Sequence, residues 1–427
     1  MRARDVSTVS RPLIVILVSG LILRLLLLPL HGQEHDVVVF TQWARVLETF
    51  GTHGLYDRVE PWSLTAINYP PGYALLLLGV VRVYSLVAPA GNMALLHVLL
   101  KVPAVFADIA CAAIVYSIVV RYASRTQALV AAAIATFAPW TWPLSAIMGQ
   151  VDSVCAMFLL LALDLALDER YAESWLALGA GTLVKPFPIL VVPLLLAAQV
   201  RSEGLGLRLL AGPALALVLA YALAVPFAPS AVPPATFAWL AHEYGAGQGL
   251  FPLTSFFAAN VWTAISNPVP DTRRVLGLSL QAYGWLAFCA AQLFVLAVML
   301  RRMNAANTRM LRAQAFVAAW FLVLLALFVL TTRMHERYLA YALSIAPALW
   351  PLGAAERRTI GILTVTFLAN VGLAIAFGSH GAPAFSTLAV RLISIANIAT
   401  LAYAAYGFYD GERRNFADEF SRPLRLP

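Results

Sequence analysis

Long runs of apolar residues, separated by short polar gaps, cover most of this chain. A helix that crosses the hydrocarbon core of a bilayer needs about 20 apolar residues, and shorter helices cross where neighbours or a thinner bilayer help. The pattern therefore predicts an all-α polytopic membrane protein with about 12 transmembrane helices. The predicted spans are 12–30, 94–120, 126–147, 151–167, 174–185, 187–200, 207–226, 278–300, 313–331, 338–353, 359–378 and 386–408.

Two apolar stretches need a separate interpretation. If 73–88 crossed the membrane, Arg121 and Arg125 would lie outside, so we predict a juxtamembrane or re-entrant helix on the outer side. Lys185-Pro186 interrupts the stretch 174–200, because proline removes a backbone donor and restricts the residue before it. Two short helices should therefore meet at Lys185, near the outer face.

Two gaps are long enough to form an outer surface, and we expect the whole chain, 1–427, to be a single transmembrane domain. The first outer loop, 31–92, holds an amphipathic stretch over 37–50 and an extended segment, 68–73, so we expect juxtamembrane helices there. The second outer loop, 227–277, begins with prolines and carries a series of aromatic residues that suits a helix lying in the membrane interface.

Composition supports a membrane protein and predicts its orientation. Hydrophobic residues make up 61% of the chain and charged residues 12%, whereas about a quarter of a soluble protein is charged. Mean hydropathy is +0.80. The net charge of +8 comes mostly from arginines in gaps on one side, so the positive-inside rule places both termini inside. The charge thus reports orientation and indicates no nucleic-acid partner. Three cysteines fall inside apolar spans and suggest small core residues, with neither a disulfide nor a metal site implied: Cys111, Cys155 and Cys289.

A second group of ionisable residues falls on the predicted outer face, where charge beside hydrocarbon is costly and usually marks a functional site. Asp36 directly follows the first span. A half-shielded carboxylate there can accept a proton from an attacking hydroxyl, and the alternative is a solvated loop acid. Asp152, in the turn between two spans, is either a second carboxylate for the acceptor or a helix N-cap.

Cations on the same face suggest an anion site. Lys185 is one of only two lysines in the chain, and an ammonium at a broken helix can bind phosphate as a point charge. The alternative for Lys185 is snorkelling toward the interface. If 331–338 is helical, Arg333 and Arg337 lie one turn apart beside His335 and form a phosphate site. The alternative there is an interfacial belt of charge and tyrosine.

The other lysine has a more structural interpretation. Lys101 and Asp108 are seven residues apart and share a helix face, so we expect a polar contact inside the bundle. The outer-face residues together suit one chemistry. Glycosyl transfer from a polyprenyl-phosphate sugar needs a base for the acceptor hydroxyl and fixed cations for the departing phosphate.

Seven short stretches occur in order between residues 31 and 340. They are His35-Asp36 with Phe40 and Trp43-Ala44, Gly54-Leu55-Tyr56-Asp57, Asn68-Tyr69-Pro70-Pro71-Gly72-Tyr73, Lys101-Val102-Pro103 with Ala107-Asp108, Gly149-Gln150-Val151-Asp152-Ser153, Thr182-Leu183-Val184-Lys185-Pro186 and Met334-His335-Glu336-Arg337-Tyr338-Leu339. With them the chain resembles the GT-C superfamily of glycosyltransferases. It is most similar to bacterial relatives of the mannosyltransferase that adds the second mannose in glycosylphosphatidylinositol assembly.

The resemblance implies roles for these residues. Asp36 would be the base or acceptor-binding acid, with Asp152 beside it as the second catalytic candidate. The lipid phosphate would be held by Lys185, Arg333, His335 and Arg337. We expect substrate binding by His35, Tyr69, Gln150 and Glu336. Asn68 stands where the family often has aspartate, so position 68 receives no acid role. Metal-dependent members use several outer carboxylates with a diphosphate donor. Because this chain has fewer, we expect a monophosphate donor, no metal and no cofactor.

The sequence therefore predicts an inverting, mannosyltransferase-like hexosyltransferase. It would move mannose or glucose from a polyprenyl-phosphate donor to a hydroxyl of a glycan, lipid or protein acceptor. The site would face the extracytoplasmic side of the cell membrane, among membrane lipids. Two alternatives stay open. One is an O-antigen-type polymerase or ligase, which acts on diphosphate-linked glycans. The other is a lipid-linked sugar flippase or transporter, whose charges should line a path through the whole membrane.

Overall fold

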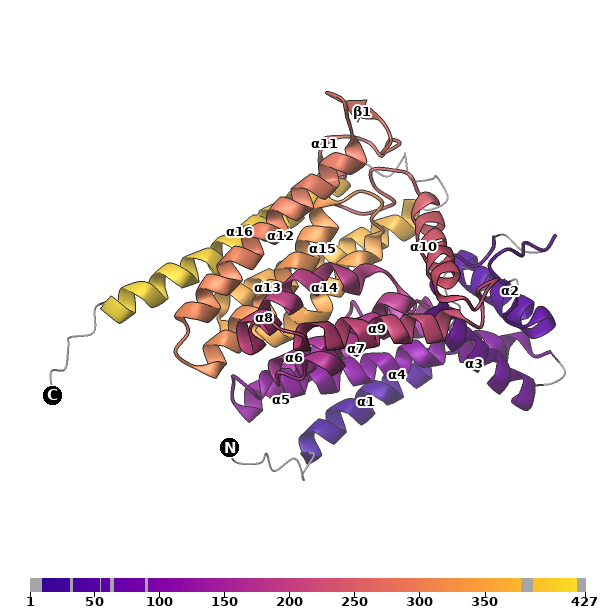
Figure 1. Ribbon diagram of the computed structural model, residues 1–427, viewed down its shortest axis with the longest axis horizontal. Coiled ribbons are helices and arrows are strands. Elements are labelled where there is room, and N and C mark those ends of the chain that lie inside the picture. The colour runs from indigo at the N-terminus through magenta and orange to yellow at the C-terminus, as the bar shows by residue number, and fades with distance from the viewer. Residues whose placement is uncertain are drawn as a thin grey trace. The chain divides into compact units, whose positions relative to one another are not determined.

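The computed structural model describes residues 10–30, 34–53, 55–61, 65–88, 91–377 and 387–420, without the side chains of residues 34, 35, 248 and 411–420. Within these ranges the regular structure is helical except for one two-stranded sheet (Figure 1). The chain divides into two compact units. The first comprises Met1–Ile189 and Leu205–Gly249, and the second Leu190–Gly204 and Leu250–Pro427. That the whole chain acts as one transmembrane domain stays a prediction.

The first unit is built around helices α4 and α6. α4 packs against α5 and α6, α6 packs against α7, and α7 packs against α9. Fully buried alanines, among them Ala104, Ala112 and Ala132, let the helix backbones approach closely. The elements of this unit are α1 Arg11–Leu27, α2 Glu34–Phe50, α3 Pro71–Val87, α4 Met93–Val119, α5 Arg125–Phe137, a π-helix at Pro143–Ile147, α6 Asp152–Leu167, α7 Tyr171–Val184, α9 Arg208–Ala224 and α10 Pro233–Gly249.

The second unit has α13 as its core helix. α13 is buried along most of its length, and it packs against α12, α14 and α16. The elements of this unit are α8 Val192–Glu203, α11 Val261–Ile265, β1 Arg274–Val275, β2 Leu278–Ser279, α12 Leu280–Ala305, α13 Arg309–Leu330, a 3-10 helix at Glu336–Tyr338, α14 Leu339–Ile345, a second 3-10 helix at Ala346–Leu352, α15 Ala354–Phe377 and α16 Leu388–Phe420.

Five helices of the described residues are long and apolar enough to cross a membrane, so the chain is a membrane protein, but the predicted count of about 12 spans is not confirmed. The five are Met93–Val119, Leu280–Ala305, Arg309–Leu330, Ala354–Phe377 and Leu388–Asp410. Three predicted spans are not single α-helices, and one of them, 187–200, is a 3-10 helix followed by α8. The helix expected over 126–147 ends at Phe137, because Ala138 precedes a proline. The span expected over 338–353 is a short α-helix between two 3-10 helices, and Pro347 and Pro351 lie in the second of these.

The interruption at Lys185 is confirmed. α7 ends at Val184, Lys185 has an extended backbone, and a 3-10 helix, Phe187–Val191, leads into α8. The apolar stretch 73–88 forms α3, and the amphipathic stretch 37–50 forms most of α2. That these helices lie at the outer membrane surface stays a prediction.

Candidate active site

Five of the predicted site residues come together in the first unit, and we call them the Asp36 cluster: Asp36, Tyr69, Gln150, Asp152 and Lys185. They lie at the start of α2, before α3, in the turn before α6, at the first residue of α6 and directly after α7. Four separate parts of the sequence therefore supply one cluster. The side chain of His35, also predicted to bind substrate, lies outside the described residues.

Gln150 holds the Asp36 carboxylate. Asp36 is half-buried, and its Oδ2 accepts a hydrogen bond from Nε2 of the fully buried Gln150 at 2.5 Å. The Gln150 backbone N–H donates to the carbonyl of Leu144 in the π-helix Pro143–Ile147. Gly149 has φ +72°, a conformation that glycine adopts easily. π-helical turns are rare and occur frequently at functional sites. Gln150 is thus placed to orient the carboxylate.

A buried network holds the π-helix against α1 and α4. Asp108 accepts hydrogen bonds from the Ser145 hydroxyl at 2.5 Å and from Arg24 Nε at 2.8 Å. The Arg24 guanidinium also donates to the backbone carbonyls of Gly20 and Thr136, at 3.1 and 2.9 Å. Arg24 and Asp108 are 84 positions apart, so spacing gave no signal for this ion pair. It compensates the charge of Arg24 inside the bundle.

Lys185 and Asp152 form a buried ion pair. Lys185 Nζ lies 2.8 Å from Asp152 Oδ1, and both side chains are 4% exposed. The snorkelling alternative for Lys185 is therefore wrong. The N-cap alternative for Asp152 is also wrong, because Asp152 is the first helical residue of α6 and Val151 occupies the cap position without a side-chain hydrogen bond. A buried ion pair is costly to disrupt, because removing one charge leaves the other buried and uncompensated.

Aromatic side chains wall this cluster. The Lys185 ammonium lies 5.1 Å from the centre of the Tyr69 ring, within the range of a cation–π contact. Tyr69 packs edge-on against Trp43 and Tyr73, with ring centres 5.6 and 4.8 Å apart. Its backbone carbonyl accepts a hydrogen bond from the Tyr56 hydroxyl at 2.8 Å. Burial, with the nearby Glu243 carboxylate, raises the pKa of Tyr56, so this hydroxyl stays protonated and donates.

Gly72 brings the start of α3 against the end of α7. A Cβ at this position would lie 2.6 Å from the carbonyl oxygen of Leu183, a separation that real Cβ atoms do not reach. The Tyr-Pro-Pro-Gly segment therefore rests on the backbone two residues before Lys185. This contact fixes Tyr69 near the ammonium.

The second unit holds the remaining predicted site residues, in a different arrangement from the one expected. Segment 331–335 is not helical, and Arg333 has φ +62°, so Arg333 and Arg337 do not share a helix face. Arg333 instead forms two hydrogen bonds with Asp271, from Nε at 2.7 Å and from Nη2 at 3.1 Å. The fully buried Asp271 also accepts from the Thr332 hydroxyl. Sequence reasoning missed Asp271, which lies in an irregular loop with no periodic pattern.

His335, Glu336 and Arg337 are buried together. Arg337 Nη1 donates to Glu336 Oε1 at 3.0 Å, and its guanidinium lies 5.6 Å from the Tyr338 ring centre. The His335 ring packs against Phe251 and Phe256, with ring centres 5.0 and 4.8 Å apart. The alternative of an interfacial belt is therefore wrong for these three residues, because each of them is only 5–6% exposed.

Lys101 makes a polar contact inside the bundle, but not with Asp108. Its ammonium donates to the carbonyl oxygens of Leu28 and Leu30, at 3.1 and 2.6 Å. It thereby satisfies backbone acceptors at the end of α1, which have no partner within a helix. Its stem lies 3.5 Å from the Cβ position of Gly149, so Lys101 also supports the turn that carries Gln150.

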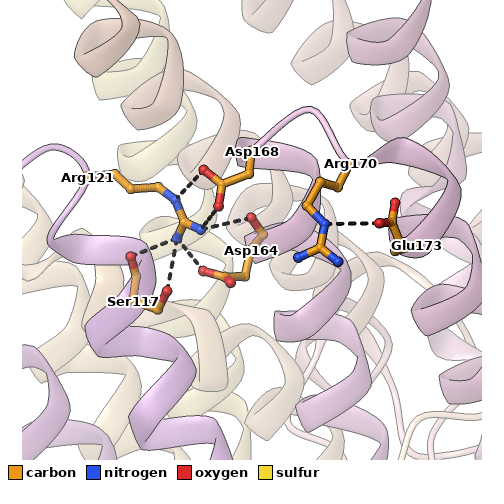
Figure 2. Close-up of polar contacts among 6 residues, drawn as sticks. All are labelled: Ser117, Arg121, Asp164, Asp168, Arg170 and Glu173. Carbon is orange, nitrogen blue, oxygen red and sulfur yellow. Dashed lines mark hydrogen bonds and ion pairs between the residues drawn. The ribbon is translucent and has the colours of Figure 1, made fainter. Parts of the chain in front are cut away.

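A further ion cluster joins the ends of α4 and α6 (Figure 2). Arg121 contacts the carboxylates of Asp164 and Asp168 and the carbonyl of Ser117. Burial acts to lower the pKa of Arg121, but the hydrogen bonds with Asp168 and Asp164 outweigh it and raise the pKa. Arg121 was expected only as an inner-face positive charge, and it also crosslinks two helices.

No metal-binding arrangement stands out in the described part of the chain. Within the described residues, no group of three or more His, Cys, Asp or Glu side chains is placed to hold a metal ion. Donor type and metal dependence stay predictions.

Comparison with known proteins identifies the fold. No protein-family model matches the sequence, and no curated protein matches it. The crystal structure of ArnT from Cupriavidus metallidurans bound to undecaprenyl phosphate is similar, with a TM-score of 0.51 and 14% sequence identity. The match covers 95% of this chain and 79% of ArnT. The fold is therefore similar to that of ArnT, and membership of the GT-C superfamily stays a prediction.

Oligosaccharyltransferases of Archaeoglobus fulgidus give weaker matches. One, tethered to an acceptor peptide, has a TM-score of 0.45 and 14% identity over 93% of this chain and 55% of its own. The other, AglB with an inhibitory peptide and a dolichol-phosphate, has a TM-score of 0.47 and 13% identity over 93% and 56%. This chain spans about half the length of these archaeal proteins. The specific relation to the second mannosyltransferase stays a prediction.

Proposed function

We propose that this chain is a membrane glycosyltransferase that transfers mannose or glucose from a polyprenyl phosphate to an acceptor hydroxyl, with inversion. The observation that carries the proposal is the Asp36 carboxylate, oriented by Gln150 beside the buried Lys185–Asp152 pair. Two further points support it. The fold is shared with ArnT, and the ArnT structure is bound to undecaprenyl phosphate.

Asp36 is the proposed general base. The acceptor oxygen attacks the anomeric carbon, Asp36 takes the hydroxyl proton, and the bond from that carbon to the phosphate oxygen breaks. Polyprenyl phosphate leaves with the bonding electron pair. Gln150 is a neutral side chain, and its amide N–H orients the Asp36 carboxylate. Inversion follows from a single displacement at the anomeric carbon.

Lys185 is the proposed phosphate ligand of the first unit. Its ammonium has three donors, and one is directed at Asp152. A phosphate oxygen would compete for the others, and a compact point charge suits a monophosphate. Asp152 then has a positioning role, because it fixes the ammonium beside Tyr69.

The basic residues of the second unit are unequal candidates for phosphate ligands. Two donors of Arg333 already bind Asp271, so Arg333 is a weaker candidate for a phosphate ligand than Arg337 and His335. Glu336 pairs with Arg337 and is proposed to hold that guanidinium in position. Tyr69 and His35 are proposed to contact the sugar or the acceptor. The site would face the extracytoplasmic side of the cell membrane, and the acceptor would be a glycan, lipid or protein.

A transfer assay with purified protein tests the function. Polyprenyl-phosphate mannose and polyprenyl-phosphate glucose are each offered with a panel of glycan, lipid and peptide acceptors. We expect a sugar-acceptor product and free polyprenyl phosphate in equal amounts. Product from diphosphate-linked oligosaccharides alone would favour a polymerase or ligase. Movement of uncleaved donor across the membrane of reconstituted vesicles, with no transfer product, would favour a flippase.

A further inference from the structure

The two-stranded hairpin of the second unit exposes an apolar tip that the proposed reaction does not use. β1 pairs with β2, and Val275 lies opposite Leu278. Leu276 at the tip is 95% exposed, while Val275 and Leu278 are 45% and 43% exposed. Three adjacent exposed apolar side chains are unfavourable in water and favourable in contact with lipid.

The backbone of the turn makes the leucine more unusual. Leu276 has φ +48° and Gly277 has φ +88°. A two-residue hairpin turn with positive φ at both positions is of type I′, and it favours Asn-Gly or Asp-Gly. A leucine in the left-handed region carries a steric cost that asparagine or glycine largely avoids. Local turn chemistry therefore does not explain Leu276, whereas a role for its apolar side chain does.

The hairpin is fixed to the start of α12. The Tyr283 hydroxyl, in the first turn of α12, donates to the Val275 carbonyl at 2.9 Å. The Leu280 N–H donates to the Arg273 carbonyl at 3.0 Å. In Figure 1 the hairpin extends from this end of α12. These hydrogen bonds fix the position of the apolar tip relative to α12.

This attachment places the tip at a membrane boundary. α12 begins at Leu280, directly after β2, and it is one of the five helices that are long and apolar enough to cross a membrane. Each arm of the hairpin, at about 3.3 Å per residue, reaches roughly 10 Å from that point. The headgroup layer adds about 5–8 Å to each side of the hydrocarbon core. When the hairpin runs along the membrane surface, an arm of this length keeps the tip within the headgroup layer.

The charge of the hairpin complements anionic headgroups. Arg273 and Arg274 are exposed, and segment 272–279 has no acidic residue. The nearest acid in sequence, Asp271, is fully buried and bound to Arg333. Arginines are usually placed on the inner side of a membrane protein, yet these two lie in the predicted outer loop, which calls for a separate reason.

We propose that residues 273–278 form a lipid anchor, in which Leu276, Val275 and Leu278 insert into the bilayer interface and the two arginines bind anionic phospholipid headgroups. The anchor would hold the loop 250–272 and its contact to Arg333 at a fixed depth. The proposal does not depend on the glycosyltransferase assignment, because it uses only the second unit and the start of α12.

Fluorescence quenching tests the anchor. A bimane label on Val275→Cys, in a Cys289→Ser background that removes the exposed native cysteine, reports on the tip. The full chain is reconstituted into phosphatidylcholine vesicles with or without phosphatidylglycerol. Nitroxide-labelled lipids quench from the bilayer, and iodide quenches from water. We expect strong quenching by the lipids and weak quenching by iodide.

Two variants separate the apolar and charged contributions. Leu276→Asn suits the positive φ and keeps the turn but removes the apolar tip, so quenching should shift from lipid to iodide. Arg273→Gln with Arg274→Gln should reduce the ratio of inserted to non-inserted tip by about fivefold per arginine in anionic vesicles and leave it unchanged in neutral ones. Iodide quenching without lipid quenching in the parent protein, or no shift in Leu276→Asn, would overturn the proposal.

Discussion

At the scale of single residues, every basic residue predicted to bind phosphate lies close to a carboxylate, and His335 Nδ1 lies 3.9 Å from Glu336 Oε2. Lys185 contacts Asp152, Arg333 contacts Asp271, and Arg337 contacts Glu336. Sequence reasoning located two of these carboxylates but assigned them other roles, because spacing along a chain does not say which side chains meet. The acids keep the cations in place before substrate arrives.

The Lys185 variants separate binding from stability. Lys185→Ala should destabilise the protein by about 3–5 kcal/mol, because it leaves the buried Asp152 carboxylate unpaired. Lys185→Arg keeps a positive charge for that carboxylate, so the loss should be smaller, yet donor affinity should fall because a planar fork does not replace a point charge. Detergent-solubilised unfolding and donor-binding titrations measure the two effects. Full donor affinity in Lys185→Arg would remove the phosphate role.

The stability part has its own control. In the double variant Lys185→Ala with Asp152→Ala no charge is left unpaired. Its free energy of unfolding should therefore be higher than that of Lys185→Ala alone. If the two losses simply add, the ion pair does not have the coupling expected from a 2.8 Å buried contact.

At the scale of elements, proline and glycine determine how the site is built. Lys185-Pro186 predicted the helix break from sequence, because the consequence of proline is local. The π-helix at Pro143–Ile147 was not predicted, since it depends on tertiary partners of Ser145 such as Asp108. Apolar periodicity located the helices well but overextended the one ending at Phe137.

Two glycines of α3 give a matched test of the contact between α3 and α7. Gly72→Ala places a Cβ against the Leu183 carbonyl, so we expect lower stability and weaker donor binding. Gly79→Ala has no atom within 4 Å of the new Cβ and should stabilise α3 by about 0.5–1 kcal/mol. Thermal unfolding of both variants measures this. Equal behaviour would mean that the close approach at Gly72 is unimportant.

At the scale of the whole molecule, the sequence predicted a helical membrane protein, and the five long apolar helices agree with that prediction. The fold is similar to that of ArnT, and the GT-C assignment stays a prediction. The number of spans was harder to predict, because an apolar stretch such as 338–353 can be buried inside the protein and need not cross the bilayer. Apolar composition reports burial, and it does not distinguish lipid from protein as the partner.

Orientation is open to direct measurement. Asp57 is exposed in the predicted first outer loop, and Leu205 is 87% exposed beside the predicted inner-face arginines Arg201 and Arg208. In the Cys289→Ser background, Asp57→Cys should react with a membrane-impermeant maleimide on intact cells, and Leu205→Cys only after the cells are opened. The reverse pattern would place the Asp36 cluster on the cytoplasmic side.

The most direct test of the central claim is single-turnover sugar transfer by Asp36→Asn at saturating donor and acceptor. The substitution keeps the size of the side chain and a hydrogen bond to Gln150 after an amide flip, but it removes the base. Asp57→Asn, at an exposed acid of the same loop, is the matched control and should transfer at the normal rate. The account predicts a rate lower by about 10²–10⁴-fold for Asp36→Asn, with donor binding retained. A rate within about threefold of the unmodified protein would contradict it.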